Sequence, residues 1–518
     1  MNPVRLANRI VRLGWMLAVM LIVSVLASRG ASAQTPTLNA LVTFNGTNGS
    51  IPEDVGSLAA DVNGNLFGTT TGLFTAGHGT VFEVKVDSST ATGYATTPTT
   101  LVSFNGANGA TPIGGLIADA HGNLFGTTSA GGVHNNGTVF EVKVDSTTAT
   151  GYATTPTTLV NFANVADAFA GLIMDASGNL FGTSFLGGTT VYFGTVYEVK
   201  VDSTTATGYA STATVLVSFN QANGQYPNGT LILDPNGDLL GTTSFGGANY
   251  SCPPVGLCGT VFEIKTDSTT ATGYANTPTV LASFNGADGG YPEGSLMADA
   301  HGNLFGTTYA GGPFFACSDG CGTVFELKTD STTATGYAST PITLVSFNST
   351  DGQGPVAGLI ADANGSLFGS TSGLCALPAL VQPTCPTKYG TIFAIKTDST
   401  TGTGYASTPT TLITFTAANG AFPVAMLIAD VHGNLFGTAY AGGTLSSGAF
   451  GSGEVFEVTG SGFVPPLSFA GTPGTPNCHG VSISTLAQTY GGIDHAAMSL
   501  GYPSVAALQY AVRAFCGN

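Results

Sequence analysis

A tandem repeat constrains this 518-residue chain more than any other feature of its sequence. The motif Leu-Val-Thr-Phe, or a close variant, recurs seven times at an average spacing of about 62 residues. A repeat of this length is one supersecondary unit, so we expect seven similar units and not several unlike domains. The seven motifs begin at Leu41, Leu101, Leu159, Leu216, Leu281, Leu344 and Leu412.

Each repeat contains four short segments with β-strand character. Their apolar residues alternate with polar ones or are bounded by Gly- and Asp-containing turns, and no helical periodicity separates them. Four strands in each of seven units favour an all-β, seven-bladed β-propeller over an open solenoid, because closure of a ring hides the sheet edges. In the second copy the four predicted strands are residues 116–119, 123–128, 138–144 and 157–162.

The order of the strands predicts how the ring closes. If residues 116–119 form an innermost strand, each Leu-Val-Ser-Phe segment is the outermost strand of the preceding blade. The first such segment, Leu41–Phe44, has no blade before it, so we expect it to complete the last blade beside Glu454–Val458. Pro466–Phe469 also resembles the repeat and is the alternative outer strand.

The N-terminus has the pattern of a secretory signal peptide. Three arginines precede an apolar run at residues 13–27, and Ala31-Ser32-Ala33 supplies the small residues of a cleavage site. The run is shorter than the roughly 20 apolar residues that span a bilayer. Residues 1–33 are therefore predicted to be removed after Ala33, which places the protein outside the cell or in the periplasm.

The charge balance excludes two classes of function. Loss of the leader removes four arginines, so 8 basic residues face 29 acidic ones, a net charge of −21. A chain of this charge repels nucleic acid and anionic membranes. Charged residues are only 8% of the chain and glycines number 74, which fits neither a helical bundle nor a charge-rich disordered chain.

The cysteines fall into local pairs. An even number of cysteines in an exported protein predicts disulfides, whereas a zinc site would need four converging ligands that these isolated pairs do not supply. The predicted pairs are Cys252 with Cys258, Cys317 with Cys321, Cys375 with Cys385, and Cys478 with Cys516.

The repeat also carries a resemblance. Asp-x-x-Gly-Asn-Leu-Phe-Gly-Thr-Thr, then a variable Gly-rich loop and Gly-Thr-Val-Phe-Glu, resembles the Gloeo-Verruco (GloVer) tandem repeat family of exported bacterial proteins. The likeness covers about residues 41–458, with departures at Asp238-Leu-Leu240 and at Gly453-Glu454. It implies an exported repeat protein and carries over no catalytic residues.

Several residues recur in equivalent positions, which favours structural roles for them. The aspartates of the Asp-x-x-Gly turns are predicted to cap those turns, because a catalytic centre is asymmetric and calcium needs 6–8 converging oxygens. Histidines of the same turns are expected to be solvated and not metal ligands. The Thr-rich connectors, each with one tyrosine, are expected to be structural, with a regular ligand array as the alternative. The residues concerned are Asp61, Asp119, Asp175, Asp234, Asp299, Asp362 and Asp430, His121, His301 and His432, and Tyr94, Tyr152, Tyr209, Tyr274, Tyr337 and Tyr405.

Variation between the copies is concentrated in the loop between the second and third strands. Function is generally carried by loops held on a rigid scaffold, so we expect any ligand to bind the face that bears these loops. Their aromatic residues are candidates to stack on sugars or to grip a protein, and the alternative is that they cover the strand ends beneath them. The candidate ligand-binding residues are Tyr192, Phe193, Tyr250, Phe314, Phe315 and Tyr389.

The chain changes character after the repeats. Residues 41–459 are assigned to the propeller, 460–477 to a Pro- and Gly-rich linker, and 478–518 to a small helical tail tied by Cys478 and Cys516. A role of the tail in wall attachment or sorting is a hypothesis, with a capping domain as the alternative.

The function favoured by the sequence is non-enzymatic binding of a glycan or protein partner, without cofactor or metal. The alternative is a propeller enzyme, a lyase or hydrolase acting on an extracellular polymer. Catalysis needs converging acids, bases or metal ligands, and the unrepeated carboxylates are spread over separate loops. These are Glu53, Asp54, Asp288, Glu293, Asp319 and Asp351.

Overall fold

All regular secondary structure in the described part of the chain consists of β-strands. The structure, a computed structural model, divides into two units, of which the larger comprises residues 1–361 and 365–463. The smaller unit, residues 362–364 and 464–518, is described only at residues 362–364 and 464–465. The predicted leader and helical tail therefore lie outside the described residues. These are 35–52, 57–61, 63–72, 77–163, 165–188, 193–249, 252, 256, 258–313, 320–373, 389–416, 418–442 and 451–465.

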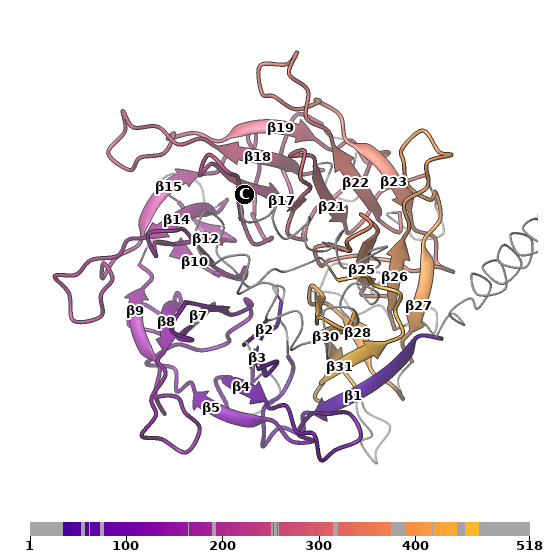
Figure 1. Cartoon of the computed structure of the whole chain (residues 1–518). Coiled ribbons are helices and arrows are strands. Elements are labelled where there is room, and N and C mark those ends of the chain that lie inside the picture. The colour runs from indigo at the N-terminus through magenta and orange to yellow at the C-terminus, as the bar shows by residue number, and fades with distance from the viewer. Residues whose placement is uncertain are drawn as a thin grey trace, which may run out of the picture. The chain divides into compact units, whose positions relative to one another are not determined.

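Seven antiparallel sheets form the blades of a β-propeller, which confirms the predicted fold class (Figure 1). Six blades consist of four consecutive strands each, and the seventh takes its outermost strand from the start of the chain. We number the blades in chain order, starting from the one that contains residues 59–103. The first three are β2 (Ala59–Ala60), β3 (Leu66–Thr70), β4 (Thr80–Val84) and β5 (Thr99–Ser103); β6 (Ile117–Ala118), β7 (Leu124–Thr128), β8 (Thr138–Val142) and β9 (Thr157–Asn161); and β11 (Ile173–Met174), β12 (Leu180–Ser184), β14 (Thr195–Val199) and β15 (Thr214–Ser218).

The remaining blades repeat this pattern. The third blade is accompanied by a short ribbon in which β10 (Val165–Ala166) pairs with β13 (Leu186–Gly187). The fourth to sixth blades are β16 (Ile232–Leu233), β17 (Leu239–Thr243), β18 (Thr260–Ile264) and β19 (Thr279–Ser283); β20 (Met297–Ala298), β21 (Leu304–Thr308), β22 (Thr323–Leu327) and β23 (Ile342–Ser346); and β24 (Ile360–Ala361), β25 (Leu367–Thr371), β26 (Thr391–Ile395) and β27 (Thr410–Thr414).

The seventh blade closes the ring with the two ends of the repeat region, as predicted. It contains β29 (Ile428–Ala429), β30 (Leu435–Ala441), β31 (Glu454–Thr459) and β1 (Thr37–Thr43), with β28 (Ala421–Pro423) also paired to β30. In β1, Val42 lies opposite Val455 and Thr43 opposite Glu454, and Figure 1 shows β1 beside β31. β30 and β1 occupy both edges of β31, and the alternative outer strand, Pro466–Phe469, lies outside the described residues.

The core lies between neighbouring blades. The second and third strands of each blade are buried on both faces, because the next blade covers each side. The central glycine of Leu-Phe-Gly-Thr-Thr is required by this packing: a Cβ on Gly126 would lie 2.7 Å from the Phe140 ring and 2.9 Å from Leu116. Glycine at this position lets the phenylalanine of the third strand lie across the second strand.

Candidate functional site

The repeated aspartates cap the turns between the first and second strands, as predicted. Asp119 Oδ1 accepts hydrogen bonds from the backbone N–H groups of His121 and Asn123, at 2.8 and 2.9 Å. Asn123 Oδ1 in turn accepts from the backbone N–H of Val144 at 3.0 Å, which ties the turn to the end of the third strand. The carboxylate–backbone bond recurs at Asp61, Asp175, Asp234, Asp299, Asp362 and Asp430.

The departure in the fourth copy preserves the same turn. Asp238 stands in place of the asparagine, and its Oδ1 accepts from the backbone N–H of Thr266 at 2.7 Å and from the Thr266 hydroxyl at 2.9 Å. The histidines of these turns are solvated, since the His121 and His301 side chains are 85% and 84% exposed. His432 lies in the equivalent turn, where its backbone N–H donates to Asp430.

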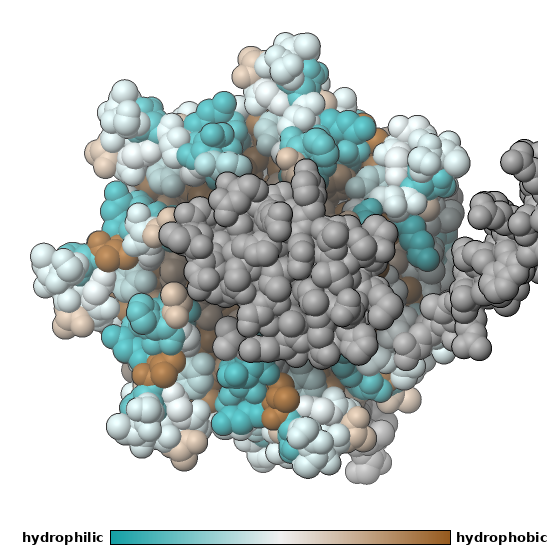
Figure 2. Space-filling model, viewed as in Figure 1, coloured by the Kyte–Doolittle hydropathy of each residue, from teal (hydrophilic) through white to brown (hydrophobic). Residues whose placement is uncertain are grey.

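The Thr-rich connectors form six hairpin arms between the third and fourth strands, and they project from the ring (Figure 1). Most of their surface is pale or hydrophilic in Figure 2. In one arm, Tyr152 pairs with Val144 across the base and packs edge-to-face on Phe67 of the preceding blade, with ring centroids 5.6 Å apart. The arm tyrosine is thus an inter-blade contact, which favours the structural interpretation. The arms are residues 87–98, 145–156, 202–213, 267–278, 330–341 and 398–409.

The unrepeated carboxylates form no metal-binding group in the described part of the chain. Asp288 and Asp351 each cap a tight turn, accepting from the backbone N–H of Asn285 at 2.9 Å and of Asn348 at 2.8 Å. No group of three or more His, Cys, Asp or Glu side chains in the described ranges is placed to hold a metal ion. Glu53, Asp54 and Asp319 lie outside the described residues.

One predicted disulfide is present, and a third cysteine is also oxidised. Cys252 and Cys258 are joined, with Cα atoms 5.2 Å apart, inside the loop between β17 and β18. Cys321 is likewise disulfide-bonded. The remaining predicted partners, Cys317, Cys375, Cys385, Cys478 and Cys516, lie outside the described residues.

The loops between second and third strands share one side of the blades with the segments that enter each first strand, because the strands alternate in direction. We call this side the loop face. Two of the predicted binding aromatics are described there. Phe193 packs edge-to-face on Tyr226 at 5.9 Å, and Tyr389 packs on Phe422 at 5.8 Å. Tyr192, Tyr250, Phe314 and Phe315 lie outside the described residues.

The entry segments hold a residue in the left-handed backbone region at the same point of every blade. Tyr226 has φ 57°, its N–H donates to the Phe193 carbonyl at 2.8 Å, and its carbonyl accepts from Ser244 N–H at 3.1 Å. This conformation costs an L-residue about 1–2 kcal/mol, so the surrounding loops must hold it in place. The equivalent residues are Ile51, Thr111, Asp167, Tyr291 and Phe422, with Gly354 in the sixth blade.

Six aromatic side chains on the third to fifth blades form a continuous cluster on the loop face, which we call the aromatic arc. Phe185 and Tyr226 stack with centroids 4.7 Å apart and planes 20° apart. Phe245 contacts Tyr226 at 5.7 Å and Tyr291 at 5.0 Å. Tyr291 is buried and the other five are half-buried, so the arc presents partly exposed rings on fixed backbone. Its members are Phe169, Phe185, Phe193, Tyr226, Phe245 and Tyr291.

Three polar side chains come from the same entry segments. Burial raises the pKa of Asp167 and raises the pKa of Glu293 to about 7. The Asn228 Oδ1 atom is buried and has no hydrogen-bond partner among the described residues. Aromatic faces beside amide and carboxyl groups that retain bonding capacity can hold a ligand with both apolar faces and hydroxyl groups.

Sequence reasoning had selected only one residue of the arc, Phe193. Phe185 and Phe245 stand where the second copy has Ser129 and Ala130, just after the second strand. An alignment of the seven copies would have indicated these two residues, since in each case a phenylalanine replaces a small residue at a loop position. Phe185 and Phe245 both contact Tyr226 only because neighbouring blades pack in the propeller, and this contact was not visible in the sequence.

Three solved structures show low similarity to this chain. A luciferin-regenerating enzyme is 14% identical, with TM-score 0.38 over 68% of this chain and 93% of that chain. PorZ, a surface component of the type-IX secretion system of Porphyromonas gingivalis, is 13% identical, with TM-score 0.40 over 74% of this chain and 45% of that chain. A protein of unknown function from Dyadobacter fermentans DSM 18053 is 12% identical, with TM-score 0.37 over 66% and 92%. Similarity at this level assigns no activity.

The repeat itself identifies the family. No curated protein matches the chain. Residues 30–211 and 205–376 both match the Gloeobacter/Verrucomicrobia repeat, and together they cover more than half of the 518 residues. This confirms the resemblance found in the repeat motif, and the chain belongs to the Gloeobacter/Verrucomicrobia repeat family.

Proposed function

We propose that this protein is exported and binds a neutral glycan on its loop face, without catalysis. The observation that carries the proposal is the aromatic arc, in which five half-buried rings from the third and fourth blades form one patch. The rings occupy positions where the copies differ, so the patch is asymmetric on a scaffold that is otherwise repeated. A binding site for one ligand needs such asymmetry.

The chemistry of the arc favours a sugar over an anion. Tyrosine and phenylalanine offer apolar faces with little conformational entropy to lose, and the backbone bonds of Tyr226 fix its position before binding. Asn228 and Asp167 offer hydrogen-bonding groups to hydroxyls at the edge of this surface. The surplus of acidic residues, 29 against 12 basic ones in the full chain, disfavours polyanionic ligands.

Export is supported by the disulfide between Cys252 and Cys258, since such bonds persist in oxidising compartments. The bridge lies in a loop beside the arc, where the Tyr291 hydroxyl donates to the Cys252 carbonyl at 3.3 Å. In the described ranges, no helix is long and apolar enough to cross a membrane.

The experiment is a glycan array probed with the full mature chain, followed by titration of the best neutral ligand. Tyr226→Ala removes the central ring of the arc, and we expect it to weaken binding roughly 30-fold, the size of a hot-spot aromatic. Tyr226→Phe keeps the ring and should bind within about threefold of wild type. Val133→Ala, at a 76% exposed loop position outside the arc, is the matched control. Capture of a protein partner in place of any glycan would contradict the proposal.

A second candidate function rests on Glu293. Its pKa of about 7, raised by burial, suits a general acid or base near neutral pH. A lyase or hydrolase acting on an extracellular polymer would place this carboxyl against the bond to be cleaved. Incubation of candidate polysaccharides with wild type and Glu293→Gln tests it: product formed by wild type and lost in the variant would favour this function over binding alone.

A further inference from the structure

The seventh blade lacks a pair of hydrogen-bonded hydroxyl side chains that the other six blades share. At the loop-face end of the second and third strands, two hydroxyl side chains are hydrogen-bonded across the ladder, as in Thr128 with Thr138 at 3.0 Å. The seventh blade has Ala439 opposite Glu454 at this point. The other pairs are Thr70–Thr80, Ser184–Thr195, Thr243–Thr260, Thr308–Thr323 and Thr371–Thr391, at 2.7–2.8 Å.

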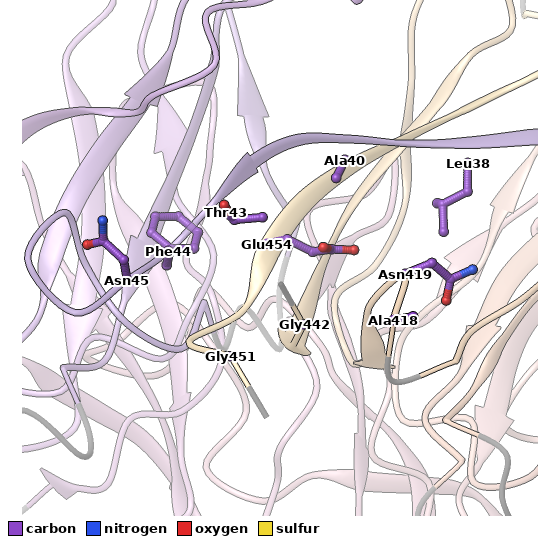
Figure 3. A pocket seen from close by; sticks show the side chains of 10 residues that line it. All are labelled: Leu38, Ala40, Thr43, Phe44, Asn45, Ala418, Asn419, Gly442, Gly451 and Glu454. Atoms are coloured by element: carbon purple, nitrogen blue, oxygen red, sulfur yellow. The ribbon is translucent and has the colours of Figure 1, made fainter. Parts of the chain in front are cut away.

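A pocket lies beside Glu454 at the point of ring closure. The pocket has a volume of about 420 Å³, within the range of small-molecule sites. Glu454 extends into the space between β1 and residues 418–419 (Figure 3). Its carboxyl group fits beside Gly420 and Gly442, where a Cβ on either glycine would crowd the carboxyl oxygens. The lining residues are Leu38, Ala40, Thr43, Phe44, Asn45, Ala418, Asn419, Gly442, Gly451 and Glu454.

Among the described residues, no cation pairs with the carboxyl group of Glu454. The residue is 2% exposed, and its Oε1 atom has no hydrogen-bond partner among the described residues. Glu454 is the only ionisable residue of the ten that line the pocket, and burial alone raises its pKa to about 8. A buried carboxylate needs a paired cation or hydrogen-bond donors.

The other lining groups define what kind of cation fits. Leu38, Ala40 and Ala418 supply apolar surface in the same pocket as Glu454. Asn45 and Asn419 each cap a turn through Oδ1, which accepts from the backbone N–H groups of Thr47 and Thr416, so their positions are fixed. One carboxyl group cannot supply the 6–8 oxygens of a calcium site, whereas a single ammonium group needs only one carboxylate and a few further acceptors.

We propose that this pocket binds a small organic primary amine, whose ammonium group pairs with Glu454 and whose apolar body lies on the side of the pocket that Leu38 lines. The site is separate from the aromatic arc, and it uses residues of the first strand and the seventh blade only. The amine binds only the ionised carboxylate. At a pH where the carboxyl group of the free protein is protonated, binding therefore releases one proton from Glu454.

The test is calorimetric titration of the mature chain with benzylamine and with benzyl alcohol, its neutral analogue of similar shape. We expect benzylamine to bind at least about tenfold more tightly at pH 8 than benzyl alcohol. Its affinity should fall by up to about tenfold per pH unit below the pKa of Glu454, with proton uptake by the buffer.

Two variants separate the carboxylate from the cavity. Glu454→Gln keeps the shape, and it should lose about tenfold or more in benzylamine affinity together with the pH dependence. The double variant Ala439→Thr/Glu454→Thr restores the hydroxyl pair of the other blades and should bind neither compound. Equal binding of benzylamine and benzyl alcohol, no binding of benzylamine, or unchanged affinity in Glu454→Gln would each overturn the proposal. Tyr226→Ala should leave benzylamine binding unchanged, so failure of this site and failure of the glycan site give different results.

Discussion

The turn aspartates show how one residue type, repeated seven times, serves the scaffold and not a reaction. Asp119 holds two backbone N–H groups and the Asn123 amide, and these bonds are made within five residues of the chain. Local bonds of this kind define the turn without a contribution from distant residues. A catalytic interpretation would require one of the seven to differ from the rest.

Removal of a turn carboxylate should destabilise the propeller modestly. Asp119→Ala loses three hydrogen bonds at a half-buried turn, and we expect the free energy of unfolding to fall by about 1–2 kcal/mol. His121→Ala is the control, since its side chain is 85% exposed and should change stability by less than about 0.5 kcal/mol. Urea unfolding followed by circular dichroism measures both. A loss as small in Asp119→Ala as in the control would refute the capping role.

Glu454 should make stability depend on pH in the opposite direction from a salt-bridged carboxylate. Burial raises its folded-state pKa to about 8, above the ordinary glutamate value of 4.5. Its contribution to stability is therefore fully present below pH 4.5 and is lost as pH rises to about 8, with a limiting slope of about 1.4 kcal/mol per pH unit.

The measurement for Glu454 is a comparison of wild type with Glu454→Gln. The glutamine variant cannot ionise, so the difference in free energy of unfolding between the two proteins should change across pH 5–8 in favour of the variant. A difference that stays constant over this interval would show that Glu454 titrates as an ordinary exposed carboxyl group.

Strand β1 completes the seventh blade and thereby closes the propeller. It pairs with β31 over Thr37–Thr43, and Leu41, Val42 and Phe44 are buried against the first and seventh blades. Without it, β31 would present an unpaired edge, which is a template for association between chains.

Deletion of residues 35–44 should therefore produce a chain that self-associates and loses its cooperative unfolding transition. The control is Thr37→Ala, at an exposed position of the same strand, which should leave both properties intact. Light scattering coupled to gel filtration, with thermal unfolding by circular dichroism, measures the outcome. A monomeric deletion variant with an unchanged transition would show that another segment completes the seventh blade.

The elements also show which parts of the structure the sequence could reveal. Strand positions, the number of blades and the pairing of β1 with β31 followed from the spacing of one motif, because every copy obeys the same local rules. The aromatic arc did not follow, since Phe185 and Phe245 follow the second strands of two different blades and meet through Tyr226 only when those blades pack. The Glu454 pocket was visible only as a departure from the repeat at Gly453-Glu454, and the residue opposite Glu454, Ala439, did not stand out in the sequence.

At the scale of the whole propeller, one side of the ring is nearly the same in every blade and the other side differs between blades. The side with the turns and arms repeats the same contacts in blade after blade, such as the pairing of Val86 with Tyr94 and of Val144 with Tyr152. The loop face combines unlike loops, a disulfide and the aromatic arc. Selective recognition is expected where the copies differ, because identical sites cannot distinguish one partner atom from another.

Affinity for the neutral glycan identified on the array, measured for one matched variant on each side, tests this account most directly. Phe185→Ala/Phe245→Ala removes two rings of the arc, and Val144→Ala/Val201→Ala changes two valines at the arm bases that are 47% and 46% exposed. We predict that the first variant weakens binding by about 2 kcal/mol or more and that the second leaves the dissociation constant within about twofold of wild type. Loss of affinity in the second variant with full affinity in the first would place the ligand on the opposite side and contradict the account.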